Sequence, residues 1–258
     1  SERMEMAMNK KLLLRILAGL MAFSLIGVLF YILFSFTGNP VTSWVAERAM
    51  NRYIAEKYAH LDDLQVHDVN YNFKDGSYSV FVESKTSPDT KFFVYYRRGE
   101  PIRDDYDFFV TDKQNTIFRL EREYSRLAEE ILAKELGNPD YEIHVMYTDE
   151  IYTTGKQYLK LDMEFDRTLP VPARVMISGD LSEPSLEEVA DLLTTVYHVF
   201  QKHDYHFIEY SFYYDGEGPV ISVTGVTPEH IASGDLLALL EEAKEGDPSG
   251  SILVHIAN

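Results

Sequence analysis

The sequence predicts an α+β protein in which one N-terminal transmembrane helix precedes repeated helix-plus-antiparallel-sheet units. Three observations support this prediction. Residues 16–36 are almost wholly apolar, the remainder alternates helix-like and strand-like stretches three times, and turn-forming pairs such as Asp75 with Gly76 separate the strands. With 258 residues, 45% hydrophobic and 26% charged, the chain has the composition of a folded protein.

The apolar segment is long enough to cross a bilayer. Its 21 residues span roughly 31 Å at about 1.5 Å each, close to the ~30 Å hydrocarbon core. Lys10, Lys11 and Arg15 precede it, whereas the next basic residue is Arg48. The positive-inside rule therefore predicts a cytoplasmic segment at 1–15 and an extracytoplasmic remainder, in a single-pass protein of the cell membrane.

A cleaved signal peptide is the alternative for this segment. Its apolar region would cover about 7–15 residues and end in a small-x-small cleavage site. The segment at 16–36 is longer, and the sequence SFTGNP at 35–40 is a poor cleavage site. We therefore expect the helix to remain in the mature protein as a signal anchor.

The charge of the chain lies almost entirely after this helix. Residues 1–39 contain four of the 24 basic and two of the 42 acidic side chains, which leaves residues 40–258 with a net charge of about −20. Such a domain repels phosphate backbones, so nucleic acid is not an expected partner. The chain has no cysteine, and its stability must come from core burial rather than disulfides.

The first domain is expected at residues 41–110, with one helix and three strands. Asn39 and Pro40 are typical of a helix N-cap and first turn, and apolar residues then recur at helical spacing. Alternating residues predict strands at 69–73, 78–82 and 92–96, the first two joined by a turn at Asp75 and Gly76.

The second domain is expected at residues 111–258, as two fused helix-sheet units. Capping-box signatures at Thr111–Gln114 and Ser185–Glu188 each open an amphipathic helix. The predicted strands lie at 141–147, 159–165, 175–177, 206–214, 219–223 and 252–256, with a last helix at 235–244. This order of elements is similar to that of cystatin-like or PepSY-like modules, an analogy of fold that carries no function.

Several motifs resemble those of the YfjL-like family. They are FTGNPV at 36–41, YIAEKY at 53–58, YNFKDGSY at 71–78, and YHFIEY at 205–210, together with Ser84, Ser87–Asp89, Asp104–Tyr106 and Glu187–Glu188. Its members are small single-pass proteins of Gram-positive bacteria with N- and C-terminal YfjL-like domains. The resemblance implies this topology and domain count, and it supplies no activity and no catalytic residue.

Three histidines lie close together in the sequence: His198, His203 and His206, with Asp204 between the last two. A zinc site needs three or four converging ligands, and these residues could converge across a helix-to-strand connection. However, the sequence contains no His-x-x-x-His or His-Glu-x-x-His motif that would place two histidine ligands on one helix face. A solvated loop is the competing explanation, and we expect no bound metal or other cofactor.

Asp104, Asp105 and Asp107 form a carboxylate cluster between the third strand and the second helix. General acid–base catalysis needs two carboxylates with separated pKa values in a cleft. Adjacent loop residues usually point apart, and aspartate side chains often bond to the backbone in turns. Turn formation is therefore the competing explanation for this cluster.

Some of the 18 tyrosines could form a binding platform on exposed strand faces. The candidates are Tyr95, Tyr152, Tyr158, Tyr213 and Tyr214. Aromatic platforms bind peptides or glycans, but tyrosine is also common in half-buried strands, where it needs no ligand.

Two classes of function remain. The first is a membrane-anchored, extracytoplasmic interaction or sensory module without catalysis, whose open sheet edges accept a segment of an unknown protein partner. The second is a cell-envelope hydrolase that uses the acidic or histidine cluster, which would require those residues to converge in one deep cleft. The sequence contains no phosphate-binding loop, dinucleotide fingerprint or serine-hydrolase motif, and residues 215–218 lack the spaced ligands of a calcium loop.

Overall fold

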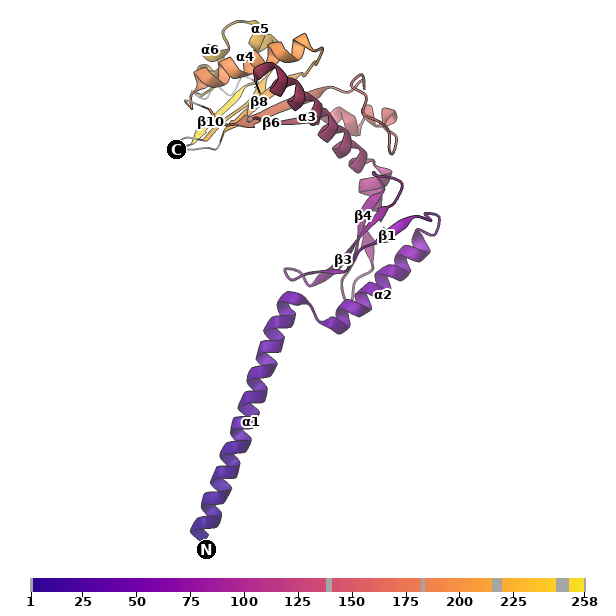
Figure 1. Ribbon diagram of the computed structural model, residues 1–258, viewed down its shortest axis with the longest axis vertical. Helices are drawn as coiled ribbons and strands as arrows, with labels where there is room; N and C mark the ends of the chain where they lie inside the picture. Colours follow the sequence, from indigo (N-terminus) through magenta and orange to yellow (C-terminus); the bar gives the residue numbers. More distant parts are fainter. Residues whose placement is uncertain (1, 138–140, 182–183, 215–219, 245–250, 258) are drawn as a thin grey trace. The chain divides into compact units, whose positions relative to one another are not determined.

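The structure, a computed structural model, describes residues 2–137, 141–181, 184–214, 220–244 and 251–257, with side chains from residue 13 onward. The chain forms two compact units, residues 1–112 and 113–258, and each unit has its own buried core. Figure 1 shows the long N-terminal helix and the helices and strands of both units. The predicted α+β class is confirmed.

The first helix, α1 (Glu2–Thr37), is longer than the predicted segment at 16–36. Nearly all its described side chains are exposed, and its length and composition would allow it to span a membrane. Gly38 ends it with a φ of +77°, and a Cβ at this position would lie 2.9 Å from the ring of Tyr71. Only glycine satisfies both the backbone angle and this close approach.

The second helix, α2 (Pro40–Lys57), begins as the sequence predicts. The Asn39 side-chain carbonyl accepts a hydrogen bond from the Val41 N–H at 2.8 Å, and Pro40 occupies the first helical position. These two features satisfy a free backbone donor and preset the helical φ angle.

The first sheet is antiparallel and lies against α2. Its strands are β1 (Leu64–Val66), β2 (Asn70–Asn72), β3 (Ser77–Ser84), β4 (Lys91–Tyr96) and β5 (Arg103–Asp104). The order is β1-β3-β4-β5, with β2 paired to β3 as well. One face of α2 packs on β3 and β4, and this core contains Ala46, Met50, Ile54, Tyr58, Val80, Val82, Phe92 and Val94.

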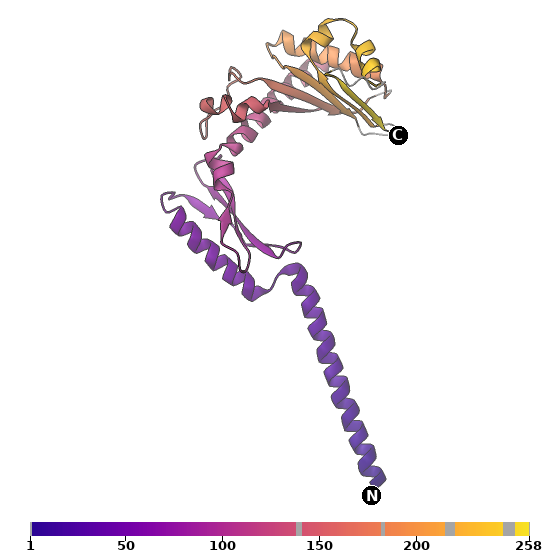
Figure 2. The ribbon, with the colours of Figure 1, turned by 180° about the vertical axis from the view of Figure 1, so that it is seen from behind.

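The second unit contains a five-stranded sheet and its helices. The strands are β6 (Tyr141–Tyr147), β7 (Ala173–Gly179), β8 (Glu209–Tyr214), β9 (Val220–Val226) and β10 (Leu253–Ala257), and the helices are α3 (Gln114–Leu136), α4 (Leu186–Lys202), α5 (Pro228–Ala232) and α6 (Leu236–Lys244). Figures 1 and 2 show α4, α5 and α6 over one face of this sheet. On the other face, Glu142, Met146 and Tyr213 are exposed.

This second sheet is mixed, so the prediction of antiparallel sheets throughout is wrong. The strand order is β10-β9-β8-β7-β6, and β7 pairs with β8 in parallel. The reason is that α4 connects these two strands, and a helical crossover returns the chain in the same direction. All other pairs in this sheet are antiparallel.

The predicted strand at 159–165 does not form. The segment after β6 contains the short helices η2 (Asp149–Tyr152) and η3 (Gly155–Tyr158), followed by turns in which Asp162 has a φ of +59°. Leu159, Met163 and Phe165 pack on the core without pairing to a strand, whereas Leu161 is exposed. The Met163 carbonyl accepts a hydrogen bond from Arg119.

The two predicted capping boxes have different outcomes. The Ser185 hydroxyl accepts a hydrogen bond from the Glu188 N–H, so this cap is confirmed. The cap at Thr111 is wrong, because the Thr111 hydroxyl bonds to Asp107 within a π-helical turn, η1 (Asp107–Thr111). Helix α3 starts later, after Lys113 in a left-handed conformation. Residues 215–218, between the predicted strands at 206–214 and 219–223, lie outside the described residues.

Candidate functional site

Asp104 is the most enclosed carboxylate of the predicted acidic cluster, with its side chain only 4% exposed. Its Oδ2 accepts hydrogen bonds from the Tyr53 hydroxyl at 2.5 Å and from Lys57 Nζ at 2.8 Å, both on α2. Burial raises the pKa of Asp104, but the hydrogen bonds from Lys57 and Tyr53 lower it by more than burial raises it. The pKa of Asp104 therefore lies below its ordinary value. Asp104 is thus an ionised anchor between β5 and α2.

Asp105 and Asp107 face other partners. Asp105 accepts hydrogen bonds from the Phe93 N–H at 2.6 Å and from the Tyr95 hydroxyl at 2.9 Å, while Asp107 accepts one from Thr111 at 3.2 Å. Burial, with the Asp105 bond, raises the pKa of Tyr95 to about 12. Each of the three aspartates therefore holds a different local contact, and together they do not form the paired carboxylates of an acid–base catalyst.

The predicted histidine group is likewise divided between separate contacts. His203 Nε2 lies 2.8 Å from Glu135, and His206 Nε2 lies 2.8 Å from Asp204. His198 is exposed on α4 beside the Tyr197 ring. In the part of the chain that the structure describes, no three side chains of metal-binding type are grouped to hold an ion.

The candidate tyrosines do not gather into one platform. Tyr213 is 39% exposed on β8, but Tyr214 is buried, so the expectation that it lines an exposed strand face is wrong. Tyr214 points to the helix-covered face because neighbouring strand residues alternate. Tyr152 and Tyr158 are exposed on η2 and η3 rather than on strands, and Tyr95 belongs to the first unit.

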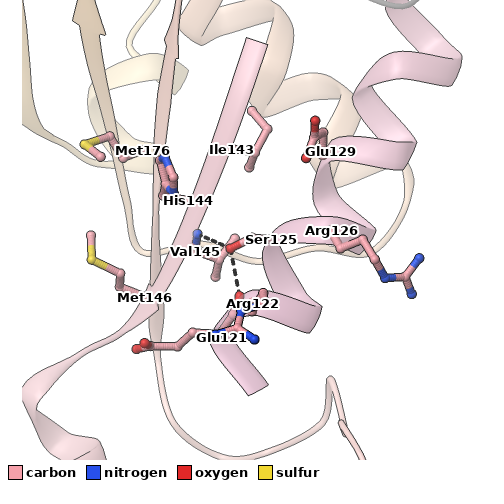
Figure 3. Close-up of a pocket in the computed structure, with 10 residues that line it drawn as sticks. All are labelled: Glu121, Arg122, Ser125, Arg126, Glu129, Ile143, His144, Val145, Met146 and Met176. Carbon is pink, nitrogen blue, oxygen red and sulfur yellow. Dashed lines mark hydrogen bonds between the residues drawn. The ribbon is translucent and has the colours of Figure 1, made fainter. Parts of the chain in front are cut away.

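A groove runs between α3 and the edge strand β6, as Figure 3 shows. Within it, the Val145 N–H donates a hydrogen bond to Ser125 Oγ at 2.8 Å. Two residues further along β6, the Tyr147 N–H donates a hydrogen bond to Glu121 Oε1 at 2.9 Å. Two side chains of α3 thus take the outward N–H groups that an edge strand would otherwise offer to another chain.

The position of Glu121 against β6 changes the pKa of its carboxyl group. Burial raises its pKa above the ordinary value, against the lowering effect of the hydrogen bond from Tyr147. Glu121 also lines a second hollow with Arg174 and Tyr152, next to the groove. Its carboxylate already accepts the Tyr147 bond, so the structure gives it a role in closing the edge of β6.

The opposite edge of the same sheet is formed by β10. This strand pairs with β9 on one side only. Among the described residues, no side chain hydrogen-bonds to the backbone of β10, and Leu253 is 65% exposed. Within the described residues, side chains therefore bond to the outer N–H groups of the β6 edge and make no such bond to the β10 edge.

Two family models match the chain. One is described as the YfjL-like N-terminal domain and matches residues 11–106, and the other is the YfjL-like C-terminal domain and matches residues 123–241. The chain belongs to the YfjL-like family. Both YfjL-like domains are present, as the sequence motifs indicated, and no curated protein and no solved structure matches the chain.

The YfjL-like N-terminal match ends at residue 106, within the acidic cluster, and the C-terminal match begins inside α3. Glu121 and Ser125 are not among the candidate residues predicted from the sequence. Their spacing of four residues was a usable signal, because it places two polar side chains one turn apart beside the apolar stripe of α3. Their partners on β6 could not be inferred from it.

Proposed function

We propose that this chain is a single-pass membrane protein whose two YfjL-like domains lie outside the cytoplasm and bind a protein partner without turnover chemistry. The membrane part of the proposal is supported by α1. Its side chains from 16 to 36 are almost wholly apolar, and all but Phe34 are exposed, on every side of the helix. Such a surface is unfavourable in water and favourable in lipid. Lys10, Lys11 and Arg15 at its start favour a cytoplasmic N-terminus.

The binding part rests on one observation, the accessible outer edge of β10. An edge strand of five residues can pair with an extended segment of another protein, which adds a strand to the sheet. Because residues 40–258 carry a net charge of about −20, a basic segment is the complementary occupant. Ser125 and Glu121 close the β6 edge, so this addition is specific to one side of the sheet.

Site-specific photo-crosslinking of the full chain in native membranes tests this proposal. A photoreactive residue at Leu253 on β10 is compared with one at Glu142, an exposed position on β6. The segment cross-linked at Leu253 is then synthesised and added to the purified full chain. We expect it to slow hydrogen exchange of the backbone amides at 253–257, and a copy with glutamine in place of its basic residues to bind more weakly.

Three outcomes would contradict the proposal. They are cross-linking at Glu142 alone, no cross-linking at either position, and a segment that binds without protecting the amides of β10. An unidentified protein captured at Leu253 would not count as support until its segment protects β10.

A further inference from the structure

A small cavity lies at the end of the second sheet where β6 stops and β7 begins, with a volume of about 310 Å³. It is separate from the groove between α3 and β6, and its walls come from α3, the two strands and the connections before β7 and β8. Polar groups from Tyr124, Tyr147, Arg167, Asp204 and His206 line it. Leu169, Val171 and Ala173 supply an apolar wall.

Two buried phenols of this cavity have unused hydroxyl groups. Tyr124 is 6% exposed and Tyr147 is 7% exposed. Neither hydroxyl has a hydrogen-bond partner among the described residues, yet neither is a fully enclosed unpaired atom like the Tyr210 hydroxyl. Both hydroxyls are therefore accessible, and both side chains line the cavity. Each hydroxyl can therefore donate a hydrogen bond to water or to a ligand in the cavity.

Arg167 adds a fixed positive charge. Its guanidinium lies 4.7 Å from the ring centroid of Tyr205, donates to the His203 carbonyl at 3.1 Å, and is 3.8 Å from Asp204. These contacts orient the group and leave further N–H donors, since a guanidinium has five. Asp204 is engaged by His206, at 2.8 Å, and faces Arg167.

The cavity therefore offers two phenol hydroxyls and the remaining Arg167 N–H groups as donors, while its carboxylate, Asp204, is already paired with His206 and Arg167. Burial raises the pKa of Tyr124 to about 12, and burial also raises that of Tyr147, so both phenols stay protonated at neutral pH and can donate. Two phenol O–H groups and a guanidinium are suited to the oxygens of a carboxylate. The volume is at the lower end of the range for small-molecule sites, about 300–1,000 Å³.

We propose that this cavity binds a carboxylate whose short aliphatic body contacts Leu169, Val171 and Ala173, with the carboxylate oxygens accepting hydrogen bonds from Tyr124, Tyr147 and Arg167. The carboxylate can come from a free small molecule of amino-acid size or from the C-terminus of a peptide. This proposal is independent of strand addition at β10, because the two sites share no residue.

Saturation-transfer NMR with the full chain in detergent tests the inference. The probes are N-acetylvaline, its amide, which lacks the carboxylate, and a tetrapeptide that ends in valine with a free carboxylate. We expect N-acetylvaline to bind and the amide not to bind. Binding of the tetrapeptide as well would identify a peptide C-terminus as a source, whereas binding of N-acetylvaline alone would indicate a free small molecule.

Two variants assign the binding to this cavity. Tyr147→Phe keeps the ring and removes only the hydroxyl, and we expect it to weaken N-acetylvaline binding about tenfold. The matched control is Tyr158→Phe, an exposed side chain that does not line the cavity. Equal binding of acid and amide, no binding of any probe, or equal affinity of the Tyr147→Phe variant and the parent would overturn the proposal.

Discussion

At the scale of single residues, Asp104 shows how a conspicuous carboxylate can have a structural role. Its side chain is nearly buried, which is costly for a charge unless partners compensate it. Tyr53 and Lys57 supply that compensation from α2, and the Tyr106 N–H supplies a third hydrogen bond at 3.1 Å. The anchor joins the last strand of the first sheet to the helix that covers it.

Replacing Asp104 by asparagine is expected to destabilise the first unit by about 2 kcal/mol. The change removes the negative charge that Lys57 and Tyr53 bond to, while it leaves the side-chain size almost unchanged. Denaturant unfolding of the full chain in detergent, followed by hydrogen exchange of peptides from the first unit, measures the loss. Asp62→Asn is the matched control, because Asp62 is exposed and makes no described contact.

The stability lost in the Asp104→Asn variant is expected to depend on pH. Because the pKa of Asp104 is lowered in the folded state, its stabilisation is present above the unfolded value of about 3.9 and is lost as the pH falls through the folded value. The difference between parent and Asp104→Asn should therefore be full near pH 7 and shrink below about pH 4. A difference that is constant from neutral to acid pH would argue against an ionised anchor.

At the scale of elements, polar side chains on successive turns of α3 align with alternate N–H groups of β6, because the two repeat distances are similar. Four residues of a helix advance about 6.0 Å, and two residues of a strand advance about 6.6 Å. Glu121 and Ser125 on α3 can therefore meet Tyr147 and Val145 on β6 in successive rungs that run in opposite directions. Glu129, one turn further along α3, lines the same groove as Ile143.

Amide hydrogen exchange can test this closed edge one rung at a time. In the parent chain, the amides of Val145 and Tyr147 should exchange slowly although β6 is an edge strand. Ser125→Ala removes the acceptor of the Val145 N–H only, so exchange at Val145 should become about tenfold faster while Tyr147 stays protected. If both amides accelerate together, or neither does, the side chains of α3 are not what protects the strand.

The sequence predicts the elements whose periodicity is set by burial on one face. The apolar stripe of α2 and the alternation in β3, β4 and β6 are of this kind, because the residues that contact the core recur at a regular spacing. The segment at 159–165 has the same alternation but no neighbouring strand to pair with, and periodicity alone cannot detect that. The strands β1 and β5, of three and two residues, are too short to show a period.

The roles of candidate site residues depended on partners far away in sequence. Asp104 bonds to Lys57, 47 residues earlier, and Glu135 lies beside His203, 68 residues later. The sequence indicates that these residues are polar and clustered, but it does not contain the tertiary contact that decides what each one does. The cavity at Tyr124 and Tyr147 was missed for the same reason, since both side chains follow ordinary core patterns.

At the scale of the whole molecule, the chain is stabilised by two separate clusters of buried side chains, one in each unit. The cluster of the first unit contains Met50 and Val94, and that of the second contains Leu193 and Phe212. No described residue belongs to both. No described side chain of helix α1 belongs to either cluster, so its exposed apolar side chains contribute to neither core.

The absence of cysteine from the sequence allows the orientation of the chain to be tested without background. Lys74→Cys places a thiol at an exposed position after β2, and Asn9→Cys places one before the apolar segment. With intact cells and a membrane-impermeant maleimide, we expect Lys74→Cys to be labelled and Asn9→Cys to be labelled only after the membrane is permeabilised. The reason is the excess of Lys10, Lys11 and Arg15 on the N-terminal side of the span. Labelling of Asn9→Cys in intact cells would reverse the orientation, and release of the Lys74→Cys chain into the soluble fraction would exclude α1 as an anchor.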